Sequence, residues 1–564
     1  MTDTSGTGRL HPKIIEAQDL VRRGRMDRRG FVRVAALLGM SAGAAYALAG
    51  LPHPAFAAEE GLPFAPDDPN AREGGILRVA MQVQKMEDPA TFSWTQMSNQ
   101  ARQIIEYMTM TGPDNVTRPM LAERWEASDD LKTWTFHLRR GVRWHNGDEF
   151  NADDVVFNFE RWCDPALGSS NAGLSTFSAV LKDEGDKKVL IPGAIEKVDE
   201  HTVRLNLSKP VLSVAEDLYN YPTPIVHRSF QPPFEQNPIG TGPYQLGEFE
   251  VGSRCILRRV KETTDGRPFE YWGGKVYLDE IHYYNFDAEN QLTALASGDV
   301  DAIYEFGIEQ LELARALDGN IIPTRTAQTV TCRMRVTEEP FGNEKLRKAV
   351  QLGLDTSVYK ELIFQGDGDE GEHHHVSPIH PEYFPLPKLE RDVERARQLL
   401  TEAGYPNGIT LSIDVGNTDG PWQQSVCEIM RDQLRDVGIT LNINVMPASR
   451  YWEIWDTTPF GATAWTHRPL GTMVMSLGYR SGAAWNESAY SNPEFDAALD
   501  AAEAELDVEE RKKKMETAER ILQESAVVML PVWRPVYTMT SKQVHGYPPH
   551  PTQYHQFHKV WVES

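Results

Sequence analysis

The stretch ITLSIDVGNTDGPWQQSVCEIMRDQLRDVGITLNINVM, Ile409–Met446, contains the pattern that decides the fold class. Two β-prone segments, ITLSIDV and ITLNINVM, flank a region of helical spacing, in which one face carries Val426, Ile429, Met430, Leu434 and Val437. The helix is expected to end at Gly438, a typical C-terminal residue. Strand, helix and strand joined by short links form a βαβ unit. This unit predicts a parallel sheet covered by helices.

The segments on either side of this unit extend the same architecture. GGILRVAMQV (Gly74–Val83) predicts the first strand, and TWTFHLRR alternates as a half-buried strand does. Asn151 is a suitable N-cap for the helix that follows. One long charged helix is expected over Asn492–Glu524, before the closing strand AVVMLPVW. We therefore predict an α/β protein with mixed sheets.

Length and charge narrow the functional classes. A chain of 564 residues is too long for one core, so two or three domains are expected. The formal net charge of −24 disfavours nucleic acid and anionic lipid as partners, since both bind clustered Lys and Arg. Four dispersed cysteines, Cys163, Cys255, Cys332 and Cys427, form no C-x-x-C pair, but one or two disulfides remain open if the protein is exported.

The N-terminal region has the parts of an export signal in order. Arg28 and Arg29 precede a mild Ala/Gly/Leu stretch, and Ala55-Phe56-Ala57 is an A-x-A cleavage site. The stretch is too short and too diluted by Gly and Ser for a membrane anchor. The adjacent arginines resemble a twin-arginine (Tat) signal. We predict a signal peptide over residues 1–57 and a monomeric periplasmic product without membrane insertion.

No sequence motif indicates catalysis. G-x-S-x-G, H-E-x-x-H and Walker-type patterns are absent from the sequence. A G-x-G-x-x-G does occur at Gly366, Gly368 and Gly371, but its acidic neighbours would repel a pyrophosphate. We interpret it as a flexible acidic loop. We predict no catalytic residue, no enzyme activity and no cofactor.

The run EHHHVSPIH contains His373, His374, His375 and His380, all of which are candidate ligands for a divalent metal. Adjacent residues rarely point at one ion, and the surrounding sequence is rich in Gly, Asp and Pro. We therefore interpret the run as an exposed loop and predict no metal site.

Several ordered blocks are similar to one family. LAERWEASDDLKTWTFHLRRGVRWHNGDEFNADDVVFNFER (Leu121–Arg161) resembles the signature of family 5 extracytoplasmic solute-binding proteins, the peptide/opine/nickel-type components of ABC importers. NPIGTGPYQLGEFEVGSRCILRRV (Asn237–Val260), YWGGKVYLDEIHYYNF and ALASGDVDAIYEF resemble the blocks that follow. Two more blocks, which begin FGNEKLRKAV and YSNPEFDAAL, match the C-terminal half, so the resemblance covers nearly all of residues 74–545.

The resemblance implies a periplasmic binding protein-like fold of two lobes that close on a ligand around a hinge, with an extra domain inserted near the N-terminus. It places the first lobe at 74–105, 230–325 and 535–564, the inserted domain at 106–229, and the second lobe at 326–534. The crossings near Thr326–Thr331 and Pro531–Pro535 would form the hinge. The implied partners are a small-molecule ligand, held between the lobes, and the permease subunits of an ABC transporter.

The chain departs from peptide-binding relatives at one place. Where those relatives typically read W-x-x-D-Y-x-D-P, with an Asp that pairs with the peptide's α-amino group, this chain reads AWTHRPLGT. His467 or Arg468 replaces that Asp, and Trp465 offers a flat face for stacking. A guanidinium suits a carboxylate or a phosphate. We therefore hypothesise a ligand with an anionic group, such as an opine-like conjugate; the alternative is that Arg468 pairs with an internal acid.

The same alignment supplies further candidates for ligand contact. Tyr479, Arg480 and Trp485 are expected to face the cleft from the second lobe, one of Arg333 and Arg335 to point inward, and Trp94 to contact ligand from the first lobe. The sequence thus predicts the substrate-binding component of an ABC importer for a small peptide-like or opine-like solute. The alternatives are a binding protein for nickel or a metal chelate, and a periplasmic hydrolase.

Overall fold

The computed structural model describes residues 10–52, 63–185, 187–505 and 507–563. The expected cleavage site, Ala55–Ala57, lies outside the described residues.

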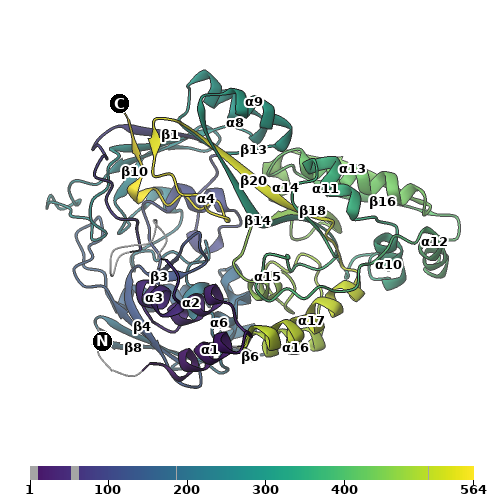
Figure 1. Ribbon diagram of the computed structural model, residues 1–564, viewed down its shortest axis with the longest axis horizontal. Coiled ribbons are helices and arrows are strands. Elements are labelled where there is room, and N and C mark those ends of the chain that lie inside the picture. Colours follow the sequence, from purple (N-terminus) through teal and green to yellow (C-terminus); the bar gives the residue numbers. More distant parts are fainter. Residues whose placement is uncertain (1–9, 53–62, 186, 506, 564) are drawn as a thin grey trace.

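One long mixed sheet runs through the molecule, and both lobes are built on it (Figure 1). In spatial order its strands are β10 (Tyr244–Glu250), β11 (Arg254–Arg259), β12 (Glu280–Asn285), β1 (Ile76–Met81), β13 (Ala302–Phe306), β20 (Val532–Ser541), β14 (Gly319–Met334), β18 (Phe460–Trp465), β16 (Ile409–Val415) and β17 (Ile439–Val445), with β15 (Asp369–Glu370) on β20 and β19 (Val528–Met529) on β14. The pairs β1–β12, β1–β13, β16–β17 and β16–β18 are parallel, and the others in the path are antiparallel. The mixed α/β class is confirmed.

The βαβ unit forms where the sequence predicts it. Strand β16 (Ile409–Val415) pairs in parallel with β17 (Ile439–Val445), and α13 (Trp422–Arg435) connects them. Val426, Met430 and Leu434 are buried against the sheet because helical spacing places them on one face of α13.

Two strands pass from one half of the sheet to the other. Strand β14 pairs with β20 over its first half and with β18 over its second, so the same strand belongs to both lobes. The register between β14 and β20 shifts between Arg325 and Gln328, where Thr326 donates its hydroxyl to the carbonyl of Arg534 at 2.8 Å. This irregularity lies where we predict the hinge.

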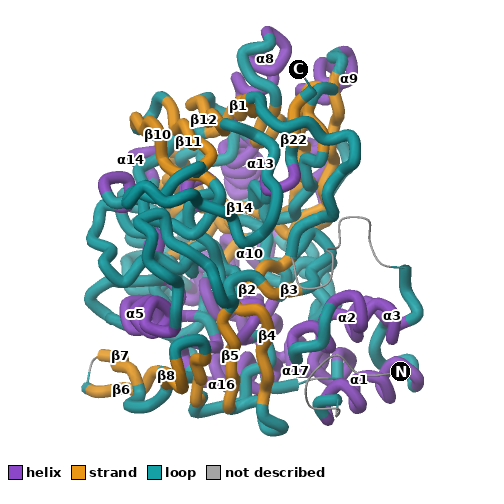
Figure 2. Tube along the Cα trace, turned by 90° about the vertical axis from the view of Figure 1, so that its left-hand side faces the viewer, coloured by secondary structure: helices purple, strands orange, loops and turns teal. Residues whose placement is uncertain are grey.

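Within the described residues, four smaller sheets accompany the long one. They are β4 (Ala122–Ala127), β5 (Thr133–Leu138), β9 (Thr202–Asn206) and β8 (Ile195–Asp199) in one sheet, and the pairs β2 (Thr109–Thr111) with β3 (Thr117–Pro119), β6 (Leu181–Glu184) with β7 (Lys187–Leu190), and β21 (Val544–His545) with β22 (Trp561–Val562). The four-stranded sheet and β6–β7 lie at the bottom of Figure 2. They fall within the range that we predict for the inserted domain, whose boundaries remain a prediction.

Helices cover these sheets. Their bounds are α4 (Thr95–Ala101), α5 (Ala152–Trp162), α6 (Ser175–Ser178), α7 (Val214–Asp217), α8 (Ala288–Ser297), α9 (Leu311–Ala316), α10 (Glu344–Leu352), α11 (Ser357–Phe364), α12 (Val393–Glu402), α14 (Ala448–Tyr451), α15 (Gly471–Gly478), α16 (Pro493–Glu503) and α17 (Val508–Ser525). The prediction of one helix over Asn492–Glu524 is wrong in its continuity. The chain breaks after α16 because Asp507 caps a new helix, and its carboxylate accepts the backbone N–H of Glu509 at 3.0 Å.

Two further expectations need correction. The acidic G-x-G-x-x-G segment is not a free loop, since its Asp369 and Glu370 form β15 on β20, and Arg325 binds Asp369 at 2.8 Å. No disulfide forms: all four cysteines are free and buried.

The segment predicted as the export signal is folded against the body of the protein. It forms α1 (Pro12–Arg22), α2 (Arg28–Leu37) and α3 (Ala42–Ala49), which lie beside β3, β4 and α17 (Figures 1 and 2). On α2, the side chains of Phe31, Val32 and Val34 are at most 4% exposed. No helix among the described residues is long and apolar enough to cross a membrane.

Polar contacts fix this segment to two different regions. The indole N–H of Trp125 donates to the carbonyl of Leu37 at 2.7 Å, and Arg33 pairs with the buried Glu216 at 3.2 Å. On the other side, Arg25 binds Asp507 at 2.8 Å near the start of α17. The segment therefore bridges the predicted inserted domain and the predicted second lobe.

Candidate functional site

Strand β18 leads directly into the candidate site. All six of its residues are buried between β14 and β16, so the chain leaves the sheet from its interior at Trp465. The following loop carries His467 and Arg468, which are 3% and 2% exposed, before α15 begins at Gly471. Arg468 lines a narrow pocket together with Tyr219 and Tyr554.

The guanidinium of Arg468 has aromatic neighbours but no carboxylate partner. Its Cζ lies 4.8 Å from the ring centre of Tyr221 and 5.9 Å from that of Trp485. Only Nη1 is hydrogen-bonded, to the carbonyl of His467 at 3.2 Å and more weakly to Thr466, whereas Nε and Nη2 have no partner. Within the described residues, Arg468 forms no ion pair, so the alternative of pairing with an internal acid is wrong. A buried, unpaired cation is costly, and the N–H donors of two nitrogens, Nε and Nη2, are left for an anion.

Arg102, at the end of α4, is a second buried arginine of this kind. Its Cζ lies 3.8 Å from the ring centre of Tyr554 and 5.1 Å from that of Tyr219, the two tyrosines that line the pocket with Arg468. Its Nη2 donates to the Ser98 hydroxyl at 3.2 Å, while Nε and Nη1 have no partner among the described residues. Two guanidiniums without carboxylates therefore lie close to one pocket.

Six aromatic side chains form a continuous set, here called the aromatic cluster. Its members are Trp94, Tyr221, Trp452, Trp455, Trp465 and Trp485. Trp94, from the first lobe, lies 5.2 Å from Trp452 of the second, and Tyr221 lies 5.7 Å from Trp485. The indole N–H groups of Trp94 and Trp452 have no hydrogen-bond partner among the described residues. The cluster thus spans the lobes and offers flat faces together with free donors.

Behind the cluster, Glu487 holds Trp465 in place. Its Oε1 accepts the indole N–H of Trp465 at 2.7 Å, and its Oε2 accepts Nε of Arg333 at 2.9 Å. Burial raises the pKa of Glu487, and the charge of Arg333 opposes that rise. The remaining donors of Arg333 go to the carbonyls of Thr458 and Trp455. Arg333 therefore positions Trp465 through Glu487, and each of its three nitrogens already makes a hydrogen bond within the protein.

The structure places the other candidates in different surroundings. His467 accepts the backbone N–H of Ala327 at 3.1 Å, and burial holds its pKa well below the usual range, so the ring is neutral and contributes no positive charge. Arg480 pairs with Asp500 at 2.8 Å and with Glu503 at 2.9 Å.

Tyr479 lies one layer behind Trp465. The hydroxyl of Tyr479 bonds to Nδ1 of His375 at 2.9 Å, and the ring of His375 lies 5.1 Å from Trp465. Of the predicted contacts, Trp94, Trp465, Arg468 and Trp485 come together, whereas Tyr479 and Arg480 do not join them.

The histidine run is buried, so the expectation of an exposed loop is wrong. His373, His374, His375 and His380 are at most 4% exposed. Burial lowers the pKa of His373 and of His380 to about 4, so these rings are neutral and are satisfied by nearby backbone groups. Nε2 of His380 lies 3.0 Å from the carbonyl oxygen of Arg468 and fixes that loop. The described residues contain no group of three or more His, Cys, Asp or Glu that could hold a metal.

Sequence reasoning missed Arg102, Tyr221, Trp452, Trp455 and Glu487. The stretch YWEIW carries Trp452 and Trp455 at a spacing of three in a polar context, a weak signal for an aromatic face. No sequence signal distinguishes Tyr221 or Arg102 from ordinary core residues.

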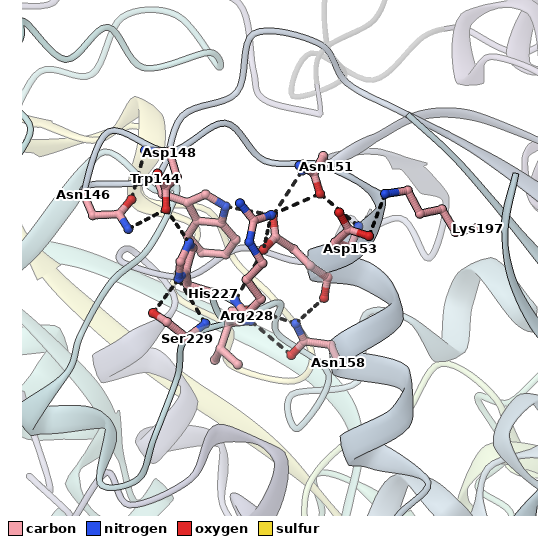
Figure 3. A network of polar contacts seen from close by, with 12 residues as sticks. Trp144, Asn146, Asp148, Asn151, Asp153, Asn158, Lys197, His227, Arg228 and Ser229 are labelled. Carbon is pink, nitrogen blue, oxygen red and sulfur yellow. Dashed lines mark hydrogen bonds and ion pairs between the residues drawn. The ribbon is translucent and has the colours of Figure 1, made fainter. Parts of the chain in front are cut away.

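Not every buried polar network in the protein has unpaired hydrogen-bond donors or acceptors. Figure 3 shows such a network around the start of α5, with Trp144, Asn151 and Arg228. Asp154 is fully buried here but accepts the indole N–H of Trp144 at 3.0 Å and the backbone N–H of Asn151 at 3.1 Å. Arg228 adds a third set of contacts to the same carboxylate. This network is saturated and serves structure, which sets it apart from the site between the lobes.

A two-lobed α/β fold with unsatisfied polar groups between the lobes defines the class of extracytoplasmic binding proteins. Residues 116–500 match the family described as bacterial extracellular solute-binding proteins, family 5 Middle, and the chain belongs to this family. The family supplies solute-binding components of transporters rather than enzymes.

Relatives and solved structures agree with this assignment. Heme-binding protein A of Haemophilus influenzae is 27% identical over 483 residues, which cover 79% of this chain and 84% of the relative. DppA of Helicobacter pylori, solved with the peptide STSA, has a TM-score of 0.75 at 23% identity and covers 87% of this chain and 99% of its own. AgaA of A. tumefacien, solved with agropinic acid, has a TM-score of 0.75 at 22% identity with the same coverage. The likeness to these two structures shows the fold alone.

Proposed function

We propose that the protein is the periplasmic substrate-binding component of an ABC importer and that its solute carries a carboxylate or phosphate-like group. The observation that carries this proposal is the buried guanidinium of Arg468, which has two nitrogens without a hydrogen-bond partner and no ion pair to an acid among the described residues. The neighbouring Arg102 adds a second positive charge beside the same pocket. A solute anion between them gains charge-assisted hydrogen bonds in a site from which water is excluded.

The aromatic cluster supplies the second part of the recognition. Trp94 and Trp452 meet across the lobes, and Tyr221 and Trp485 flank Arg468. A flat or ring-shaped portion of the solute would stack on these faces, while the free indole N–H groups bond to its carbonyl or hydroxyl oxygens. Opine-like conjugates and modified peptides have this combination of groups. Closure then presents the loaded protein to the permease.

The histidine run does not favour the metal-chelate alternative. Its four rings are engaged in separate contacts, and the described residues bring no third ligand to any of them.

The test is isothermal titration of the purified chain with agropinic acid, the peptide STSA and simple mono- and dicarboxylates. We expect an anionic solute to bind, and Arg468→Ala to weaken its binding by about tenfold to a hundredfold, the loss of a charged hydrogen-bond pair. Arg468→Lys should recover part of the affinity because it keeps the charge but loses the planar fork.

Arg124→Ala is the matched control, because it removes an exposed guanidinium whose only pairing is with Glu126. Its affinity should equal that of the unmodified protein. Micromolar binding of uncharged or plain linear peptides that Arg468→Ala leaves unchanged would refute the proposal.

A further inference from the structure

A second set of unsatisfied polar atoms gathers at the other end of the interlobe space. Glu305 belongs to β13 of the first lobe, Asp419 to the loop after β16 in the second, and Arg534 to β20, which passes between them. Nη2 of Arg534 lies 2.7 Å from Glu305 Oε2 and 3.8 Å from Asp419 Oδ2. The three side chains also line one narrow cleft.

The charges in this set do not balance. One guanidinium faces two carboxylates, and all three side chains are at most 5% exposed. Nη2 of Arg534 also donates to Gln328 at 2.8 Å, while its Nε has no hydrogen-bond partner among the described residues. Oε1 of Glu305 and Oδ1 of Asp419 have no hydrogen-bond partner among the described residues. Burial raises the pKa of both carboxyl groups, and Arg534 only partly opposes this effect.

An independent group points to the same place. The hydroxyl of Tyr304, whose side chain is 1% exposed, also has no partner within the described residues. It lies close enough to Asp419 and Glu305 that the charge of each raises its pKa. The saturated network of Figure 3 shows the contrast, because its buried Asp154 has a donor for each oxygen.

Hydrogen bonds connect the two ends. Arg534 donates to Gln328 at 2.8 Å, and Gln328 donates to Gln553 at 2.8 Å. Thr552, the neighbour of Gln553 in the chain, lines the pocket that contains Arg468. Arg468 leaves positive charge unpaired at one end, and Glu305 with Asp419 leave negative charge unpaired at the other.

We infer that Glu305, Asp419 and the Tyr304 hydroxyl form a subsite for a cationic group of the solute, a primary ammonium or a guanidinium. This inference rests on the proposed function and extends it: the solute is a zwitterion, with its anion at Arg468 and its cation at Asp419. The N–H groups of the cation donate hydrogen bonds to the three unpaired oxygens, Asp419 Oδ1, Glu305 Oε1 and the hydroxyl oxygen of Tyr304.

The subsite also links binding to closure. Glu305 and Asp419 come from different lobes, so closing the empty protein brings two carboxylates together with a single guanidinium between them. A solute cation neutralises the excess charge and makes the closed form favourable. The solute therefore binds the closed form better than the open one, which is the condition for a ligand to drive closure.

The first experiment needs no solute. Asp419→Asn removes the excess charge with little change in shape, so the melting temperature of the solute-free protein should rise by about 1–2 °C. Asp154→Asn is the matched control, because it removes a buried carboxylate whose oxygens are all paired, and it should lower the melting temperature. A fall with Asp419→Asn equal to that of the control would overturn the inference.

The second experiment uses ω-amino carboxylates of increasing chain length, each paired with the plain carboxylate of the same length, at about 10 mM in a thermal-shift assay. The subsite predicts that one length stabilises the protein more than its plain partner does, and that Asp419→Asn abolishes this difference. Equal shifts by both members of every pair, or no shift by any, contradict the subsite. Equal shifts that Arg468→Ala removes leave the anion-binding proposal standing, whereas shifts that Arg468→Ala leaves intact contradict that proposal.

Discussion

Arg468 differs from most other buried arginines of this protein in its surroundings. Arg333 and Arg480 have carboxylate partners, and Arg534 binds Glu305, whereas Arg468 and Arg102 have aromatic rings and free N–H groups. Arg468 was predictable because it occupies a position where relatives carry an acid. Arg102 was not, because the helix that carries it has no local pattern that distinguishes a ligand-facing arginine from an ordinary one.

His380 provides a pH-dependent prediction at the same scale. Burial, together with the positive charge of Arg33 and with His374, lowers its pKa to about 4, while Glu382 opposes the shift. An unfolded histidine takes up its proton near pH 6.5, so between about pH 6.5 and 4 the unfolded chain binds more protons than the folded one. His380 therefore reduces stability as the pH falls through this window.

His380→Gln should remove part of that acid sensitivity. We expect the loss of unfolding free energy between pH 7 and pH 5, measured by urea denaturation, to be smaller in the variant by on the order of 1 kcal/mol. His201→Gln, at the turn between β8 and β9, is the comparison. An unchanged pH slope in His380→Gln would show that the ring is protonated in the native protein.

At the scale of elements, the βαβ unit was predicted closely and the C-terminal helix only in part. The bounds of β16 match the sequence pattern because alternation marks them. Strand β17 begins after Gly438 as predicted but ends at Val445, one residue before the end of the predicted segment ITLNINVM. The break between α16 and α17 was missed because acidic residues run through it without Gly or Pro. Only the capping role of Asp507 decides it.

Asp507 tests that explanation. Asp507→Ala should lower the free energy of unfolding by about 1 kcal/mol or more, because it removes the N-cap of α17 and the ion pair with Arg25. Asp507→Asn keeps the cap and loses only the ion pair, so its free energy of unfolding should lie between those of the unmodified protein and Asp507→Ala. Urea denaturation measures the free energy of unfolding of the three proteins. Equal losses of this free energy in Asp507→Ala and Asp507→Asn would assign the whole effect to the ion pair with Arg25.

At the scale of the whole molecule, the two-lobed fold followed from ordered sequence blocks, and no single block was sufficient. The buried histidine run and the second polar site did not follow. Both depend on contacts between segments far apart in the chain, such as His380 with Arg468 and Glu305 with Asp419, for which no local pattern exists.

The packed N-terminal helices give a prediction at this scale. Removing residues 1–57 should lower the melting temperature by about 2 °C or more, since it exposes the apolar surface under α2 and breaks the pairs of Arg25 and Arg33. Arg25→Ala should produce part of the fall. Calorimetry of the full and shortened chains decides the matter: identical transitions would mean that these contacts contribute nothing to stability.

The same helices place a constraint on how the sequence can drift. An apolar stretch that serves only as an export signal tolerates almost any exchange of one apolar residue for another. Here Gly39 has a positive φ of 90°, and a Cβ at this position would lie 2.2 Å from the carbonyl oxygen of Trp125. Arg28 and Arg29, in contrast, stay exposed. Substitutions near Gly39 should therefore be tolerated only together with compensating changes around Trp125. Arg28 and Arg29 can vary independently of the body of the protein.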